Sequence, residues 1–280
     1  MFTENTRGEL RWLTSSHLEG TLHCFSTRCG GVSEGPRASL SLRLPGDDRE
    51  KVLENFRILG DAVGFRPEHA VLSQQMHTDI VRPVTHAQRG LGLYRPGDMD
   101  CDALITDQPG LMLTVFSADC CTILLRCRRT GAVGAVHAGW RGTAQGIVKK
   151  TVEAMVRQYG ADPARMDAAI GPCISRCCFE TDADVPEAMR AALGTLAEPA
   201  IEQRGAKYHV DLKALNRTWL QLAGVPAAQI DTSDLCTCCR EDLFFSHRRN
   251  GEARGAMAAM IGIPPLTPDR AGRVHGEAAS

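Results

Sequence analysis

Short apolar runs separated by tight turns fill the middle of the chain. Three of them follow closely on one another, over residues 111–117, 122–127 and 132–137, and the last two are separated by a polar turn that ends at Gly131. Runs of this length without polar alternation are typical of strands that are covered on both faces. We therefore predict that these segments form buried strands of one sheet.

Helical spacing of apolar residues marks four other segments. In residues 48–63, four apolar side chains recur every three or four positions, and Asp47 with Glu50 makes a capping box before them. Residues 143–159 and 183–193 are also predicted to be helical. A fourth helix is predicted around Leu212, Leu215 and Leu222, with Gly224 as its C-terminal cap.

The order of elements indicates the fold class. Further strands are predicted at residues 23–28, 167–170, 242–249 and 256–263, so helices are mixed with runs of adjacent strands. This order favours an α+β fold, with mixed β-sheets flanked by helices, over a doubly wound fold. We predict a single catalytic domain over residues 1–263. Residues 264–280 are rich in Pro, Gly, Arg and Ala and are predicted to be a disordered C-terminal tail.

Composition and charge narrow the class of protein. The chain has 32 Lys and Arg against 33 Asp and Glu, a balance that gives no sign of a nucleic-acid partner. No apolar run is long enough to span a bilayer, and Met1 to Trp12 lack the features of a secretory signal. We therefore predict a cytoplasmic protein without membrane association. Its 12 cysteines are then expected to stay reduced.

Candidate chemistry lies where three predicted strands meet turns. His77, Cys120 and His137 offer two imidazoles and one thiolate, which suit tetrahedral Zn²⁺ and leave a fourth position open for catalysis. Their spacing is not diagnostic, and the alternative is two hydrogen-bonded core histidines with a buried cysteine. A second alternative is a Cys–His hydrolase, with Cys120 as nucleophile and His137 as its base. Cys121 complicates this reading, because adjacent strand residues point to opposite faces.

Anion binding has separate candidates. Gly139 to Gly142 precede a predicted helix, where backbone N–H groups and Arg141 could hold a phosphate. Arg28, at the end of an early strand, is a second candidate, and Asn55 is a third candidate for substrate or phosphate binding. A solvated arginine in an ordinary turn is the alternative for both guanidinium groups.

Two further groups of residues are assigned structural roles. The later cysteines could form a structural zinc site, but packing of reduced thiols is the preferred interpretation, because no Cys-x-x-Cys pair is matched by a second. These cysteines are Cys173, Cys177, Cys178, Cys236, Cys238 and Cys239. The alternating acids Asp98, Asp100 and Asp102 are predicted to form a solvated turn, since no glutamate completes a calcium loop.

Eight stretches of the chain match a known family. They are His23 to Ser33, Gln75 to His77, Asp102 to Thr106, Ala118 to Cys120, His137 to Gly142, Ile170 to Ile174, Cys236 to Cys239 and Phe245 to Arg249. In these stretches the chain resembles the YfiH-type proteins, also called laccase-domain or polyphenol oxidase family proteins and, in bacteria, peptidoglycan editing factor. The resemblance runs in family order from about residue 20 to residue 263. Cys24, Thr122, Cys238 and His247 depart from the usual pattern without removing a metal ligand.

This resemblance implies both a site and an activity. It implies a YfiH-like α+β fold and metal ligands at His77, Cys120 and His137. It also implies zinc-dependent phosphorolysis of adenosine, inosine and methylthioadenosine, plus adenosine deamination. The expected partners are thus a nucleoside and phosphate, bound by a monomer or small homo-oligomer. Phosphate is expected at Arg28 and Arg141, with the three metal ligands and Arg28 as catalytic residues.

Two other activities remain open. Copper-dependent polyphenol oxidation has been attributed to the family, but nine histidines without H-x-H pairs are a poor match for several copper centres. An amidase acting on peptidoglycan precursors would use the Cys–His pair. For deamination, no glutamate stands beside the ligands as a proton shuttle. Asp119 is a candidate for this role or for orienting a histidine.

Overall fold

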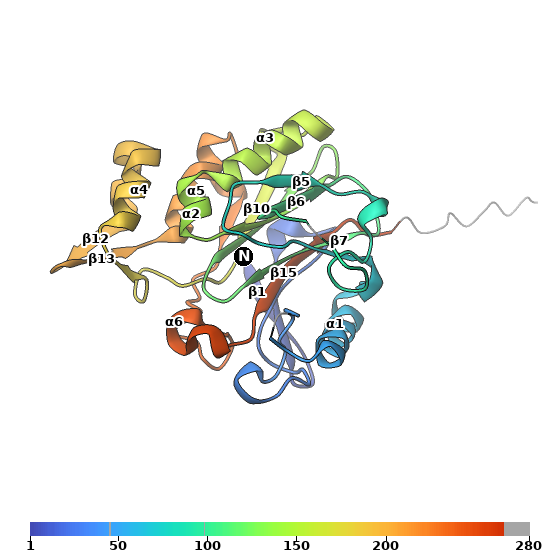
Figure 1. The fold of residues 1–280 in the computed structure, drawn as a ribbon. Helices are drawn as coiled ribbons and strands as arrows, with labels where there is room; N and C mark the ends of the chain where they lie inside the picture. Colours follow the sequence, from blue (N-terminus) through green and yellow to red (C-terminus); the bar gives the residue numbers. More distant parts are fainter. Residues whose placement is uncertain (45, 98, 266–280) are drawn as a thin grey trace, which may run out of the picture.

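The computed structural model describes residues 1–44, 46–97 and 99–265. Two six-stranded mixed sheets form its centre, and a three-stranded antiparallel sheet lies to one side (Figure 1). Six α-helices are present in the described residues: α1 (Arg49–Val63), α2 (Trp140–Ala144), α3 (Ile147–Tyr159), α4 (Asp184–Leu193), α5 (Leu212–Leu222) and α6 (His247–Asn250). The α+β class with mixed sheets flanked by helices is confirmed.

The first sheet contains both the N-terminal strands and the last strand of the described chain. The C-terminal strand β15 lies between β3 and β7, and its antiparallel pairing with both places it near the centre of the sheet. In spatial order, the strands are β1 (Phe2–Arg7), β2 (Leu10–Ser15), β3 (Leu22–Ser26), β15 (Met257–Gly262), β7 (Met112–Ser117) and β4 (Ala70–Leu72).

The second sheet contains the strands that lead into the candidate site. Its centre is the antiparallel set β10, β8, β9 and β6, with a parallel strand at each edge. In spatial order, the strands are β14 (Ile230–Thr232), β10 (Met166–Ile170), β8 (Cys121–Cys127), β9 (Val133–Ala138), β6 (Ala103–Thr106) and β5 (Val81–Pro83). The third sheet has the order β11 (Glu180–Thr181), β13 (Lys207–Val210) and β12 (Ile201–Arg204).

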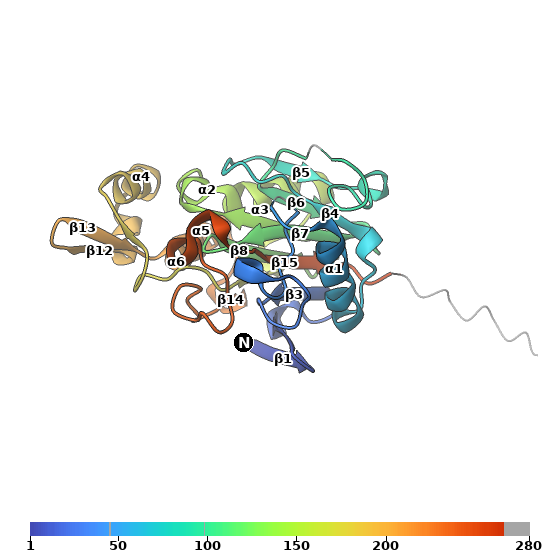
Figure 2. The same cartoon turned by 60° about the horizontal axis from the view of Figure 1, so that its bottom comes forward.

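Three apolar clusters separate four layers. Helix α1 packs on the outer face of the first sheet, and α3 and α5 pack on the outer face of the second (Figures 1 and 2). The third cluster lies between the two sheets, where Leu113 and Val115 of β7 pack with Leu124 of β8. Both faces of each central sheet are therefore covered, which explains why β7 and β9 lack polar alternation.

Several boundaries differ from the sequence prediction for local reasons. The α1 cap is Asp48 rather than Asp47, because the Asp48 carboxylate accepts hydrogen bonds from the backbone of Glu50 and Lys51. The helix predicted over residues 143–159 is two helices, α2 and α3, because Gly146 has φ +71° and breaks the chain between them. The strand predicted at 242–249 is wrong, since this segment is a turn followed by α6.

The sequence analysis also missed two hairpins, β1–β2 and β12–β13. These strands are short and mostly polar, so they lack the continuous apolar runs used to find the central strands. Of the predicted tail at 264–280, residues 266–280 lie outside the described residues. Each helix in the described part is too short or too polar to cross a membrane.

Candidate metal centre

Strand register brings the three predicted ligands together. In the antiparallel pair β8–β9, Thr122 lies opposite His137, so Cys120, two residues before Thr122, points to the same face of the sheet as His137. Cys121 points the other way, into the core under α3. His77 reaches the same point from the loop after β4, and the ligand atoms of all three residues lie within 4.8 Å of one another.

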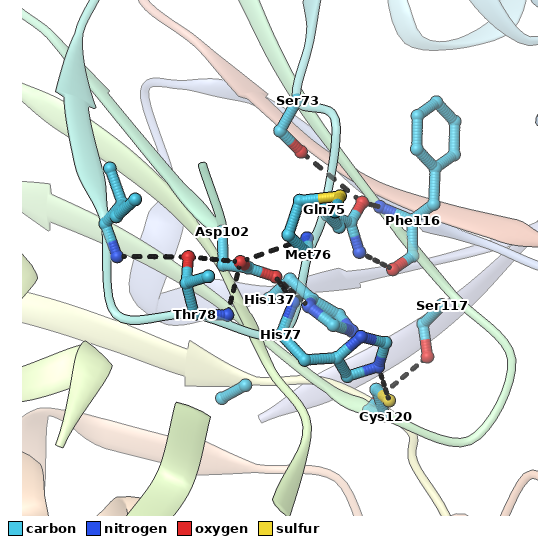
Figure 3. Close-up of polar contacts among 12 residues, drawn as sticks. Ser73, Gln75, Met76, His77, Thr78, Asp102, Phe116, Ser117, Cys120 and His137 are labelled. Carbon is cyan, nitrogen blue, oxygen red and sulfur yellow. Dashed lines mark hydrogen bonds and ion pairs between the residues drawn. The ribbon is translucent and has the colours of Figure 1, made fainter. Parts of the chain in front are cut away.

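The imidazole of His77 stands edge-on to that of His137. The two ring centroids are 5.0 Å apart, at an interplanar angle of 80°. Sγ of Cys120 lies 3.8 Å from Nε2 of His77. His137 is buried and His77 is exposed, so the group forms the boundary between the core and solvent. Figure 3 shows His77 and Cys120 directed toward each other, with His137 behind them.

One buried carboxylate holds both histidines. Oδ1 of Asp102 accepts hydrogen bonds from Nδ1 of His137 at 2.8 Å and from the backbone N–H of His77 at 3.0 Å. Its Oδ2 accepts hydrogen bonds from the backbone of Met76 and from both the backbone and hydroxyl of Thr78. These contacts hold the turn in which His77 has the unusual φ of +58° (Figure 3).

The prediction of a solvated acidic turn is therefore wrong for Asp102. Its side chain is fully buried, Asp100 is exposed, and Asp98 lies outside the described residues. Because Asp102 fixes Nδ1 of His137, Nε2 is left to face the site, an arrangement common around metal-ligating histidines. Asp102 directly precedes β6, beside β9, and its carbonyl accepts the backbone N–H of His137, a contact that the sequence does not reveal.

A second buried carboxylate holds the turn before Cys120. Asp119 also has a positive φ, +97°, and its carboxylate accepts hydrogen bonds from the hydroxyls of Thr237 and Ser246 and from the backbone of Arg248. It thus contacts two distant turns rather than a histidine. Asp119 joins the metal-ligand turn to the segment that forms the opposite wall of the cavity.

Electrostatics favour an anionic sulfur between two imidazoles. Burial alone would raise the pKa of Cys120, but His137 and His77 outweigh burial and lower the pKa to about 6. Burial would lower the pKa of His137, but the Cys120 thiolate and Asp102 outweigh it and raise the pKa to about 9. Burial also opposes ionisation of Asp102, yet hydrogen bonds from His137 and Thr78 lower its pKa to about 2.

The donor set fits a metal ion of the zinc type. Zn²⁺ prefers imidazole nitrogen and thiolate ligands, and its binding would displace the proton that His137 otherwise holds. Three protein ligands leave one position for water or substrate. Gly139 lies opposite Cys120 and keeps this space open. A Cβ at this position would lie 2.9 Å from Cδ2 of His77 and 3.2 Å from Sγ of Cys120.

A cavity of about 330 Å³ opens directly on the ligands. His77 and Cys120 form one side, and apolar groups including Trp140 and Phe179 form part of the wall. Arg141, Arg248 and Arg254 bring positive charge to it, and His247 and Glu252 add titratable groups. Among these, sequence reasoning gave no role to Glu252 or Arg254, which stand in a polar segment without a recognisable motif.

The predicted anion ligands have different surroundings. Arg141 lines the cavity, and its guanidinium carbon lies 4.2 Å from the centroid of the Trp140 ring. The helix that was expected to bind phosphate at its start, α2, has only five residues. Arg28 donates hydrogen bonds to the carbonyls of Ala38 and Glu241 and does not line this cavity. Asn55 is fully buried in α1, where it holds the loop carrying Ser33 and Ser41. The binding roles of all three stay predictions.

Comparison with known proteins places this geometry in a family. A sequence model of the multi-copper polyphenol oxidoreductase laccase family matches residues 22–264. The chain belongs to this laccase family. It is 38% identical to purine nucleoside phosphorylase YlmD of Geobacillus stearothermophilus, across 94% of this chain and 97% of that relative. The family resemblance noted in the sequence is confirmed.

Two further comparisons support the laccase-family assignment. The chain is 38% identical to adenosine deaminase RL5 of an unknown prokaryotic organism, over 84% of this chain and 90% of the relative. The crystal structure of YlmD from G. stearothermophilus superposes with a TM-score of 0.89 at 37% identity, covering 94% of this chain and 98% of the other. The fold therefore matches over nearly the whole domain.

Proposed function

We propose that the chain is a zinc-dependent purine nucleoside phosphorylase that also deaminates adenosine. The observation that carries the proposal is a cavity with both aromatic and guanidinium groups that opens onto His77 and Cys120, whose ligand atoms lie within 4.8 Å of that of His137. Relatives named purine nucleoside phosphorylase and adenosine deaminase agree with it. Adenosine, inosine and methylthioadenosine are the proposed substrates, with phosphate as co-substrate.

The apolar wall suits a purine. Trp140 and Phe179 offer aromatic faces, and Ile174 and Leu212 add buried aliphatic surface. A planar, weakly polar base gains free energy from stacking on such rings. We therefore infer that the purine lies between these groups, with the ribose directed toward the arginine side of the cavity.

Arg254 is the proposed phosphate ligand. Its buried Nε has no hydrogen-bond partner among the described residues. Burying a charged group without such a partner is unfavourable in free energy. Burial, together with the nearby Arg43, lowers the pKa of Arg254. A second cavity of about 190 Å³ places Arg37 and Arg43 beside Arg254, and Glu252 is the one acidic residue among the described residues that line it. An anion here would satisfy the guanidinium donors.

Phosphorolysis then needs three contributions from the chain. Arg254 and Arg43 orient a phosphate oxygen toward C1′ of the ribose, and the aromatic wall holds the purine. The new C1′–O bond forms as the C1′–N9 bond breaks, and the electron pair leaves with the base, which takes up a proton. His247 and Glu252 line the cavity 3.7 Å apart and are the proposed carriers of that proton.

The metal side of the cavity serves both reactions, because a bound Zn²⁺ would also stabilise negative charge on the departing base in phosphorolysis. A bound Zn²⁺ would supply Lewis acidity and a water of lowered pKa beside the base. Glu252 is the proposed proton carrier from that water to the departing ammonia, a role that glutamate fills in other zinc deaminases. Asp119 is excluded from this role because its carboxylate already accepts hydrogen bonds from three groups.

A Cys–His hydrolase, with Cys120 as nucleophile and His137 as its base, is the second candidate, because His137 and His77 lower the pKa of Cys120. Multi-copper oxidation has less support: within the described residues, the metal-ligand groups contain just two histidines, His77 and His137. We keep cytoplasmic location, the lack of a nucleic-acid partner, and a monomer or small homo-oligomer as predictions.

The test combines metal content with phosphate-dependent release of base from adenosine. We expect zinc as the bound metal, release of adenine only with phosphate, and ribose 1-phosphate as the second product. His77→Ala should lose one zinc per chain and the activity together. Inhibition by a chelator that removes only the zinc missing from His77→Ala would exclude the cysteine hydrolase, which needs no metal at this site. Bound copper with phenol oxidation, or zinc with no turnover of any nucleoside, would overturn the proposal.

A further inference from the structure

A second group of metal-binding side chains lies on the far side of the cavity wall. The sulfur atoms of Cys177, Cys178, Cys236 and Cys239 all lie within 4.8 Å of one another. We call these residues the four-cysteine cluster. They come from two turns that are some sixty positions apart in the sequence, and no disulfide links them. The cluster was not expected, since packing of reduced thiols in the core was the preferred interpretation.

Strand pairing explains how the two turns meet. Strands β10 and β14 are parallel neighbours, so the segments that follow them leave the same edge of the sheet. The pairing continues past the strands, because Cys173 and Cys236 form a bridge and the backbone of Thr237 donates to the carbonyl of Cys173. Cys173 itself is fully buried, as predicted for a core thiol, whereas Cys177 and Cys239 are exposed.

The sulfur positions are suited to one tetrahedral ion. Sγ of Cys239 lies 3.5 Å from that of Cys177 and 3.3 Å from that of Cys178. Four thiolates at about 2.3 Å from a zinc ion are about 3.8 Å apart from one another, within the spread seen here. Cys236 and Cys239 have the Cys-x-x-Cys spacing of a zinc knuckle, and the adjacent pair Cys177 and Cys178 supplies the other half.

The polar surroundings of the sulfurs also suit a metal. The backbone N–H of Ser175 donates to Sγ of Cys236, a contact that stabilises a thiolate. Four thiolates this close would repel one another strongly, so a cation among them is needed to hold all four in the ionised form.

We propose that the four-cysteine cluster binds a structural Zn²⁺, separate from the ion at His77, Cys120 and His137. Four thiolates close the coordination sphere and leave no position for substrate, which is the pattern of structural sites. Zinc is the ion for which a closed set of four thiolates is a common structural site.

The four-cysteine cluster lies where a bound ion would stabilise the wall of the cavity. Thr237 stands between two of the ligands and donates its hydroxyl to Asp119 at 2.6 Å. Arg248, which lines the cavity, donates to the carbonyl of Cys178 at 2.9 Å. Arg249 donates to the carbonyls of Thr237 and Cys238. An ion that fixes the two turns would therefore hold the cavity wall and the Asp119 turn in place.

The experiment counts zinc per chain in the purified, reduced full-length protein by plasma mass spectrometry. Wild type is expected to hold two zincs. The double variant Cys177→Ser, Cys239→Ser is expected to hold one, and Cys238→Ser, in the same turn but outside the group of four, should keep two. His77→Ala should also keep one zinc, and its cobalt-substituted form should show the charge-transfer bands of a tetrathiolate site.

Folding defects are separated from ligand loss by a conservative replacement. Cys239→His preserves a zinc-competent ligand set and should retain the second ion, with a higher melting temperature than Cys239→Ser. One zinc in wild type that persists unchanged in the double variant would overturn the inference. So would a disulfide between Cys239 and Cys177 or Cys178 in unreduced protein. The inference does not rest on the proposed activity, since zinc loss in the double variant is measurable without nucleoside turnover.

Discussion

Asp102 and His137 are joined by a 2.8 Å hydrogen bond between Oδ1 and Nδ1, and the same oxygen accepts the backbone N–H of His77. A single buried carboxylate therefore orients one metal ligand through its ring and another through its backbone. This arrangement selects the His137 tautomer in which Nε2 is free to coordinate. It also explains why the turn at His77 can hold a positive φ.

Asp102→Asn is expected to weaken metal binding. The amide keeps the shape of the carboxylate but lacks its charge. Its NH₂ group donates hydrogen bonds, so it cannot accept them as a carboxylate oxygen does. Loss of such a partner typically costs about 10–100-fold in metal affinity, which competition titration with a chromophoric chelator would measure. Asp100→Asn is the matched control, because Asp100 is exposed. Equal affinity in both variants would contradict the role of Asp102.

Gly139→Ala tests whether the space at the ligands is required. Its φ of −62° and ψ of 174° are open to alanine, so the backbone is not strained. The added methyl group would nevertheless lie 2.9 Å from the His77 ring. We expect loss of zinc at this site and of base release, with a melting temperature near that of wild type. Full zinc occupancy in a folded variant would count against this geometry.

Asp119→Ala is expected to destabilise the fold. The change leaves the hydroxyls of Thr237 and Ser246 and the backbone N–H of Arg248 without their acceptor. Each buried group left unsatisfied costs about 1–3 kcal/mol, so the free energy of unfolding in urea should fall by at least that amount. Asp182→Ala, which removes an exposed pair with Lys207, should change it by less than about 1 kcal/mol.

Arg254→Gln separates the two proposed reactions. Phosphorolysis consumes phosphate and deamination does not, so this variant should raise the KM for phosphate and leave adenosine deamination close to wild type. Hydrogen bonds to charged groups contribute about 1.5–3 kcal/mol, which corresponds to a rise of about tenfold or more. Arg28→Gln is the comparison, since Arg28 donates to backbone carbonyls. A phosphate defect in Arg28→Gln alone would restore Arg28 as the phosphate ligand.

His23 is expected to make the fold sensitive to acid. Burial lowers its pKa, and Nε2 accepts the backbone N–H of Ser15 at 3.0 Å, which requires a neutral ring. The unfolded chain therefore binds this proton more readily, and the free energy of unfolding should fall as pH decreases below about 6.5. His23→Gln should show a shallower decline between pH 7 and pH 5 in urea titrations. An unchanged slope would show that other groups carry the acid sensitivity.

Much of the scaffold followed from local patterns. Strands β7, β8 and β9 could be predicted from continuous apolar runs, because both faces of each central sheet are covered and nearly all of their residues are buried. Helix α1 was readable because one face packs on a sheet and the other meets solvent. The strand predicted at 242–249 is wrong because a short apolar run does not by itself define a strand. Leu243, Phe244 and Phe245 are buried, but they belong to a turn and loop before α6.

The sequence by itself determined which residue types could bind a metal, and the family resemblance selected His77, Cys120 and His137 from them. Tertiary structure decided what holds these ligands and what else comes together. From the sequence, Asp102 is one acid in a polar turn, and core packing of reduced thiols was preferred for Cys177 and Cys239. Their neighbours are set by pairing between strands far apart in the chain. Contacts across such distances leave no periodic signal in the sequence, so only the folded sheets reveal them.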